Sequence, residues 1–183
     1  MQHIVIETPR FYIREVQMTD VPEFFALDSD PAVHQYLGNH PVTDIAQSEA
    51  YVKDLIQSYA NDGMCRWAVI DKQDGAFVGW SGIRYETTVL SKPYYDIGYR
   101  LKAKYWGKGI ATETAQAVLN YGFAELKLPK IMGFAHVDNV GSNRVLRKIG
   151  LQYEGIFHYS AFDCYQYALS REEWLTLKES LSK

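Results

Sequence analysis

Residues 104–113 read Lys-Tyr-Trp-Gly-Lys-Gly-Ile-Ala-Thr-Glu, and this stretch decides the fold. The segment before it, residues 94–102, has alternating apolar positions that predict a strand. After it, apolar or small residues recur at three- and four-residue spacing, as on a buried helix face: Ala111, Ala115, Val118, Leu119, Gly122 and Leu126. A strand, a glycine turn and a helix start together favour an anion site, because the first N–H groups of a helix have no partner within it.

The spacing of the glycines excludes two common phosphate-binding motifs. A Walker loop would need glycine at position 102 and Ser or Thr at position 109, where the chain has Lys102 and Gly109. The dinucleotide motif fails because Thr112 stands where its third glycine or alanine belongs. From residues 107–109 alone, a tight structural turn remains an alternative.

Two motifs resemble the GNAT family of N-acetyltransferases. Lys104, Gly107 and Gly109 match the family pattern Arg/Gln-x-x-Gly-x-Gly/Ala, with Lys104 in place of the usual Arg or Gln. Residues 139–151 resemble the family's Asn-x-x-Ser helix that ends in Gly-Phe, here with Gly150 followed by leucine. The resemblance covers about residues 8–176, and residues 8–14 and 165–174 resemble the subgroup that acetylates ribosomal-protein N-termini.

This resemblance implies a mixed α/β fold with a twisted, mostly antiparallel sheet, splayed at the motif strand and flanked by helices. It implies a single acetyltransferase domain over residues 8–176, with 177–183 as the end of a C-terminal helix. Periodicity and turn residues predict strands at 10–16, 65–71, 76–86, 94–102, 130–137, 152–159 and 162–169. They predict helices from about residue 20, at 43–60, after the glycine turn, after Asn139 and at 171–182.

The resemblance also implies acetyl-CoA as acyl donor. The backbones of Tyr99, Arg100 and Leu101 would then pair with the pantetheine amides. The pyrophosphate would lie on the motif turn and helix start, formed by Lys104, Gly107, Lys108, Gly109, Ile110, Ala111 and Thr112. Asn139 would contact the pantetheine arm, although its residue type and place also suit a helix N-cap, and both roles are compatible.

Acyl transfer to an amine needs a proton acceptor and a donor for the leaving thiolate. Asp96 is the first candidate base, because its strand leads toward the thioester; Glu86, Glu154 and water are alternatives, and so is a purely structural Asp96. Many family members place a tyrosine donor where this chain has Leu146. Ser142 is therefore the candidate donor, with a simple first-turn helix serine as the alternative.

The acceptor is an amine that the sequence does not identify. Nine aromatic residues fall on strands expected to border its cleft: Trp67, Trp80, Tyr94, Tyr95, Tyr99, Phe157, Tyr159, Phe162 and Tyr165. Such a wall favours a peptide or protein N-terminus or a flat apolar amine over a polycation, although each aromatic alone is more typical of packing. A second hypothesis is a sensor of the same fold that binds acyl-CoA without turnover.

Composition limits the partners. A net charge of −3 over 183 residues, without a run of Lys or Arg, gives no support for nucleic-acid binding. No apolar run is long enough to cross a membrane, and the start of the chain lacks a signal peptide. Two cysteines without a CxxC pattern favour the cytoplasm, and five histidines without paired spacing predict no metal site. A homodimer is compatible with the sequence.

Overall fold

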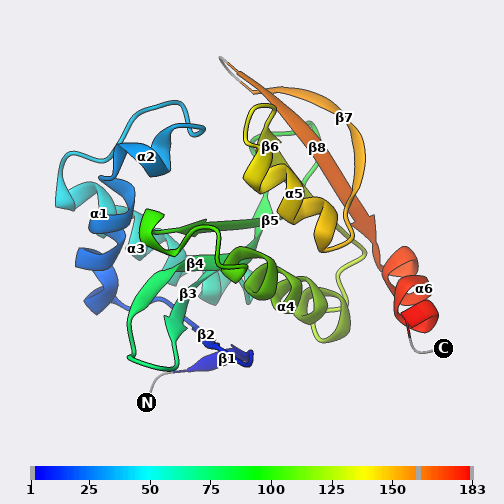
Figure 1. Ribbon diagram of the computed structural model, residues 1–183, viewed down its shortest axis with the longest axis horizontal. Helices are drawn as coiled ribbons and strands as arrows, with labels where there is room; N and C mark the ends of the chain where they lie inside the picture. Colours follow the sequence, from blue (N-terminus) through cyan, green and yellow to red (C-terminus); the bar gives the residue numbers. More distant parts are fainter. Residues whose placement is uncertain (1–2, 160–161, 182–183) are drawn as a thin grey trace.

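The computed structural model describes residues 3–159 and 162–181, and these form one eight-stranded sheet flanked by helices (Figure 1). The strands are β1 (Ile4–Glu7), β2 (Phe11–Arg14), β3 (Arg66–Asp71), β4 (Phe77–Glu86), β5 (Tyr94–Leu101), β6 (Lys130–His136), β7 (Gln152–Tyr159) and β8 (Phe162–Ser170). The helices are α1 (Val21–Asp28), α2 (Pro31–His34), α3 (Ile45–Asp62), α4 (Ile110–Ala124), α5 (Val140–Lys148) and α6 (Arg171–Leu181), with 3₁₀ turns η1 (Met18–Asp20) and η2 (Ala103–Tyr105).

The sheet is mostly antiparallel, as predicted, in the order β1-β2-β3-β4-β5-β6-β8-β7. Its one parallel pairing joins β5 to β6, through the single residue pair Asp96 and Met132. By contrast, β4 and β5 pair along the whole of β5, from Glu86 opposite Tyr94 to Gly79 opposite Leu101. The sheet therefore divides after Asp96, and the two halves diverge from there (Figure 1). This is the splay predicted at the motif strand.

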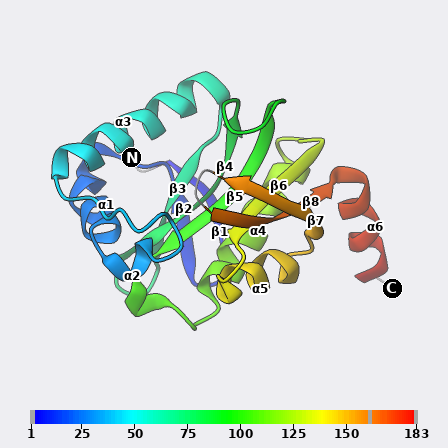
Figure 2. The same ribbon diagram turned by 90° about the horizontal axis from the view of Figure 1, so that it is seen from above.

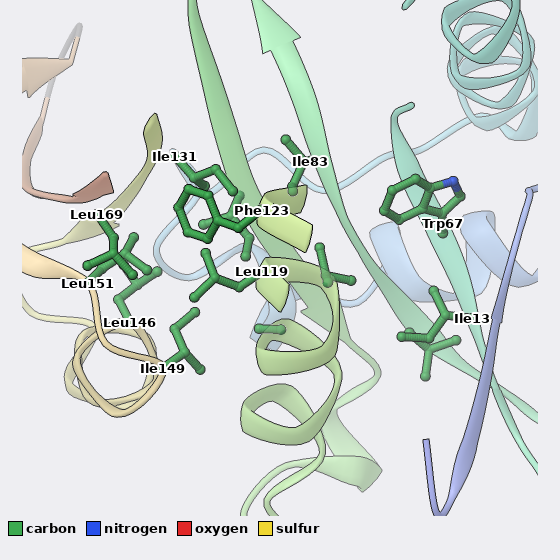
Figure 3. Packing of buried hydrophobic residues seen from close by; sticks show 14 of the residues in the cluster. Ile13, Trp67, Ile83, Leu119, Phe123, Ile131, Leu146, Ile149, Leu151 and Leu169 are labelled. Carbon is green, nitrogen blue, oxygen red and sulfur yellow. The ribbon is translucent and has the colours of Figure 1, made fainter. Parts of the chain in front are cut away.

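Helices cover both faces of the sheet, and each face has its own core (Figure 2). Strand β3 contributes side chains to both cores, because successive residues of a strand point to opposite faces of the sheet. Trp67 and Val69 pack with α4, whereas Ala68 packs with α1 and α3. In the first core, Leu119 and Phe123 of α4 lie beside α5 and β6, which Figure 3 shows in close view.

The predicted elements formed close to their predicted bounds, but two short elements near the N-terminus, β1 and α2, were not predicted. Gly63 ends α3 with φ +72°, a left-handed conformation that glycine adopts without a Cβ clash. The sequence analysis missed β1, a short strand that pairs antiparallel with β2 at the edge of the sheet. The predicted end segment 177–183 falls largely within α6, and residues 182–183 lie outside the described residues.

Candidate active site

A cleft of about 830 Å³ opens where β5 and β6 separate. One wall is formed by β5, the glycine turn and the start of α4; the first turn of α5 borders the same space. The opposite wall carries aromatic side chains from the segment after α2 and from β6, β7 and β8. Ligands of α/β proteins commonly bind at such a division of a sheet.

The β5 wall offers backbone groups. Tyr99, Arg100 and Leu101 all line the cleft, and on their other side they pair with β4. Toward β6 this stretch has no ladder partner, because the β5–β6 pairing is limited to Asp96 and Met132. Unpaired strand edges present N–H and C=O groups to any extended ligand. The Arg100 side chain turns away, since its Nη1 donates to Asp28 Oδ1 of α1 at 2.7 Å.

The glycine turn has the geometry of an anion site. Gly107 and Gly109 each have φ +74°, and Gly109 is the N-cap residue of α4. Gly107, Gly109, Ile110, Ala111 and Thr112 line the cleft together. This arrangement brings the unpaired N–H groups and the positive end of the α4 dipole to the cleft wall.

Two lysines predicted to be part of this site are not brought to the cleft. Lys104 and Lys108 are exposed, and their ammonium groups lie 5.0 and 5.6 Å from the Tyr105 ring centroid. Neither lines the cleft. A contact of either lysine with a phosphate remains a prediction, and it requires the side chain to leave Tyr105.

Arg10, the residue before β2, contacts the glycine turn from outside the cleft. Its Nε donates to Glu113 Oε2 at 2.6 Å, and its Nη1 donates to the carbonyl oxygen of Lys108 at 3.2 Å. Burial would raise the pKa of Glu113, but hydrogen bonds from Thr8 and Arg10 lower it below the ordinary value. The sequence carried no signal for this contact, because Arg10 and Glu113 are 103 positions apart.

The first turn of α5 is fixed by its cap. Asn139 Oδ1 accepts from the N–H of Ser142 at 3.0 Å, which confirms the predicted N-cap role of Asn139. Both residues line the cleft. Asn139 Nδ2 makes no hydrogen bond within the described chain, so it is the donor available to a ligand. Leu146, at the place of the family tyrosine, packs in the core with 1% of its surface exposed.

Ser142 has a neighbour that the sequence analysis did not assign. The phenol oxygen of Tyr99 lies 2.9 Å from Ser142 Oγ and 3.0 Å from the Ser142 carbonyl oxygen. Burial raises the pKa of Tyr99 above its ordinary value, although the hydrogen bond with Ser142 opposes the shift. The phenol therefore keeps its proton at any ordinary working pH.

Asp96 lines the cleft and is paired with a buried arginine. Arg66 Nη2 donates to Asp96 Oδ2, and Arg66 Nη1 donates to the backbone oxygens of Asp96 and Gly82 at 2.7 and 2.8 Å. Asp96 Oδ1 accepts no hydrogen bond from the described residues. Burial raises the pKa of Asp96, against the opposing charge of Arg66. A raised pKa suits a base, while the ion pair also fits the structural alternative.

The two weaker candidates for the base differ in position. Glu86 lines the cleft, but its Oε1 already accepts from the N–H groups of Thr87 and Thr88, each at 2.9 Å. Burial would raise the pKa of Glu86, but hydrogen bonds from the Thr88 hydroxyl and from the Thr88 and Thr87 N–H groups lower it below the ordinary value. Glu154 pairs with Lys130 at 2.6 Å and does not line the cleft.

The aromatic wall was predicted in part. Of the nine candidates, six line the cleft: Trp80, Tyr94, Tyr99, Phe157, Tyr159 and Phe162. Trp67, Tyr95 and Tyr165 do not. Tyr36, which was not predicted, also lines the cleft; it follows α2, and its ring centroid lies 5.5 Å from that of His136. Only the fold brings Tyr36 to β6.

Basic side chains at the α5 end of the cleft were also missed. Arg144 and Lys148 line the cleft, and with Val140 and Arg147 they border a second hollow of about 430 Å³. Their spacing of four residues places them on one helix face, which was the available signal. Among the described residues no group of His, Cys, Asp and Glu could hold a metal ion, and no helix could span a membrane.

Comparison with known proteins identifies the family. Residues 10–152 match the model of the acetyltransferase (GNAT) domain. The chain is 31% identical over 175 residues to the uncharacterized N-acetyltransferase YnaD of Bacillus subtilis, covering 92% of this chain and 98% of the relative. A GNAT-family acetyltransferase from Bacillus anthracis has 30% identity and a TM-score of 0.78, with 94% and 100% of the two chains covered. A similar fold, at 19% identity and a TM-score of 0.79, occurs in RimL, a ribosomal L7/L12 alpha-N-protein acetyltransferase solved with coenzyme A, with 93% and 99% covered.

The chain belongs to the GNAT family of N-acetyltransferases. It is an acyl-transferring enzyme of that family, and its fold is the one that the two sequence motifs predicted.

Proposed function

We propose that the protein transfers the acetyl group of acetyl-CoA to a primary amine, by direct attack within a ternary complex. One observation carries this proposal: a single cleft combines the unpaired edge of β5 with the glycine turn at the N-terminus of α4. An extended amide-containing arm and a pyrophosphate need these two features side by side.

The residues present fit coenzyme A. A Cβ atom placed on Gly107 would meet nothing within 4 Å, so the space above the turn is open. The N–H groups at Ile110, Ala111 and Thr112 would hold the pyrophosphate, and the open backbone groups of Tyr99 to Leu101 would pair with the pantetheine arm. The coenzyme A in the RimL structure supports this choice of ligand.

The chain's own groups can serve each part of the reaction. A backbone N–H of β5 would donate to the thioester oxygen, on which negative charge develops during attack. Asp96 Oδ1 would take the proton of the attacking amine, directly or through water. As the new C–N bond forms and the C–S bond breaks, Ser142 Oγ would donate a hydrogen bond to the leaving sulfur. No nucleophilic cysteine is required, because the amine attacks the thioester itself.

The aromatic wall supports an acceptor with a flat or apolar body, such as a peptide or protein N-terminus or a small aromatic amine. Two carboxylates line the cleft: Asp96, with one oxygen bonded to Arg66 and the other proposed as the base, and Glu86, which accepts from the Thr87 and Thr88 N–H groups. A polycation would find few free carboxylates there. The homodimer and the cytoplasmic location remain predictions from the sequence.

Two measurements, made one after the other, test the proposed acetyltransferase function. Acetyl-CoA should bind with micromolar affinity by calorimetry and raise the melting temperature, since a ligand of the folded state stabilises it. A panel of N-terminal peptides and small amines is then assayed for amine-dependent thiol release, with mass spectrometry of the products. Binding of acetyl-CoA without amine-dependent thiol release across the panel would favour the sensor hypothesis. Absence of binding would contradict the proposal itself.

A further inference from the structure

Tyr99 and Ser142 meet across the floor of the cleft, from strand β5 and from the first turn of α5. Tyr99 Oη lies within hydrogen-bond distance of both oxygens of Ser142, 2.9 Å from Oγ and 3.0 Å from the carbonyl oxygen. Both residues line the cleft. The contact joins the wall proposed to bind the pantetheine arm to the residue proposed to contact the sulfur.

The number of hydrogens limits what this pair can do. A phenol has one hydrogen and a serine hydroxyl has one, while the Ser142 carbonyl can only accept. If Tyr99 donates to the carbonyl, the Ser142 hydrogen points to Tyr99 Oη. If Tyr99 donates to Ser142 Oγ, the Ser142 hydrogen is free to point into the cleft. The two arrangements differ only by rotation of two hydroxyl hydrogens.

We propose that Tyr99 is a positioning residue for Ser142, holding Ser142 Oγ in place and donating to it while Ser142 donates to the leaving thiolate. The inference rests on the proposed function, in which Ser142 contacts the sulfur. In a chain of two hydroxyls, each hydrogen bond strengthens the other. A hydroxyl that accepts a hydrogen bond becomes more polarised, and so it donates its own hydrogen bond more strongly. Tyr99 thereby supplies, from β5, the phenol that the family pattern places at position 146, although it reaches the sulfur only through Ser142.

The pair stabilises the thiolate and does not protonate it. A thiol has a pKa of about 8.5 and a phenol about 10, so proton transfer from Tyr99 through Ser142 would be unfavourable. Burial raises the pKa of Tyr99 further. The thiolate therefore leaves hydrogen-bonded, and its proton comes from water, while the amine proton goes to the base. The phenol stays neutral throughout the cycle.

The fold of α5 does not depend on the Tyr99 hydroxyl. The first turn is already held by the Asn139 cap and by Asn143, whose Nδ2 donates to the carbonyl oxygens of His136 and Asn139 at 2.9 and 2.8 Å. Tyr167 Oη donates to Asn143 Oδ1 at 3.0 Å from the opposite side. Removing the Tyr99 hydroxyl should thus leave the helix in place.

The test compares Tyr99→Phe, Ser142→Ala and the double variant. Ser142→Ala should lower kcat by roughly 10- to 1,000-fold, the range for one donor to developing charge, with little change in coenzyme A affinity. Tyr99→Phe should lower kcat by roughly 5- to 50-fold at an unchanged KM for acetyl-CoA, as for loss of one hydrogen bond beside a charge. The double variant should be no slower than Ser142→Ala, because Tyr99 acts only through Ser142.

Two further tyrosines serve as controls. Tyr95 lies on the same strand, contacts the Tyr85 ring and does not line the cleft, so Tyr95→Phe should leave kcat unchanged. Tyr167→Phe removes a structural hydroxyl and should lower the melting temperature. The proposal is overturned if kcat of Tyr99→Phe stays within twofold of the parent value. It is also overturned if the double variant is slower than Ser142→Ala by the factor that Tyr99→Phe alone loses. A parent enzyme without turnover on any amine would instead contradict the proposed function.

Discussion

The two walls of the cleft are built in different ways. The residues of the β5–α4 wall come from one short stretch of the chain, between Tyr99 and Thr112, and this wall offers mainly backbone groups. The opposite wall uses side chains from distant parts of the chain, among them Tyr36, Phe134 and Phe162. A backbone site depends on φ and on pairing, whereas a side-chain site depends on which residues the fold brings together. The first kind can be recognised from a short motif, whereas the second was predicted only in part: Phe162 was expected at the cleft and Tyr36 was not.

The largest expected effect follows from disturbing the backbone wall. In Gly109→Val, a β-branched residue would have to adopt φ +74°, which costs about 1–2 kcal/mol for an L-residue, or the turn would move. Because the N–H groups proposed to bind the phosphates follow directly, coenzyme A affinity should fall by roughly 100- to 1,000,000-fold, the loss of two or three hydrogen bonds to a charged group at about 1.5–3 kcal/mol each. Isothermal titration calorimetry measures this change.

Gly75 offers a matched control for Gly109. Gly75 has φ +72°, nothing lies within 4 Å of a Cβ placed on it, and it does not line the cleft. Gly75→Val should carry a similar backbone cost and keep the parent affinity for coenzyme A. Equal affinities in the parent and Gly109→Val would show that the turn does not hold the phosphates.

The next prediction tests the role of Asp96, the residue of β5 after which β5 and β6 separate. If Asp96 is the base, Asp96→Asn should lower kcat/KM by roughly 100- to 10,000-fold. In the parent, kcat/KM should fall as pH drops and Asp96 becomes protonated, and this fall should occur at higher pH than for an ordinary aspartate because burial raises the pKa of Asp96. In Asp96→Asn this acid limb should disappear.

The Arg66 pairing makes a control necessary for Asp96. Removing its carboxylate leaves a buried guanidinium unpaired, which lowers stability whatever the role in catalysis. Asp54→Asn breaks an arginine–carboxylate pair outside the cleft, where Arg84 Nη2 lies 2.9 Å from Asp54 Oδ2, and should retain activity. An Asp96→Asn variant with a lower melting temperature but parental kcat/KM and an intact acid limb would assign Asp96 a structural role.

The smallest expected effect is that of removing metal ions. A loss of activity on their removal would change the chemistry proposed for both walls of the cleft. The described residues hold no cluster that could bind a metal, and the proposed chemistry uses none. Turnover should therefore be the same, within error, before and after dialysis against EDTA. Activity that is lost in EDTA and restored by zinc would require a metal in the site.

Most of the fold could be predicted because its signals are local. Apolar spacing marked α4, Gly63 marked the end of α3, and the two family motifs fixed the order of strands and helices. β1 was missed because four residues are too short to show a periodicity, and pairing with β2 decides its structure.

The residues of the cleft could be predicted from the sequence more fully than the partners that their side chains meet. Gly107, Gly109 and the Asn139 cap follow from residue type and spacing. The pairing of Arg66 with Asp96 and the contact of Tyr99 with Ser142 join elements separated in the sequence. Sequence periodicity gives the side of a strand on which Tyr99 lies, but not the helix residue that it meets.

The contact of Arg10 with Glu113 and Lys108 has a consequence for synthesis of the chain. Arg10 and Glu113 are 103 positions apart, a stretch that takes about 5–20 s to translate at 5–20 residues per second. Until Glu113 has left the ribosome, the Arg10 side chain lacks this carboxylate partner. The turn proposed to bind the phosphates is thus completed late, and we expect a nascent chain that has only its first three strands not to bind coenzyme A.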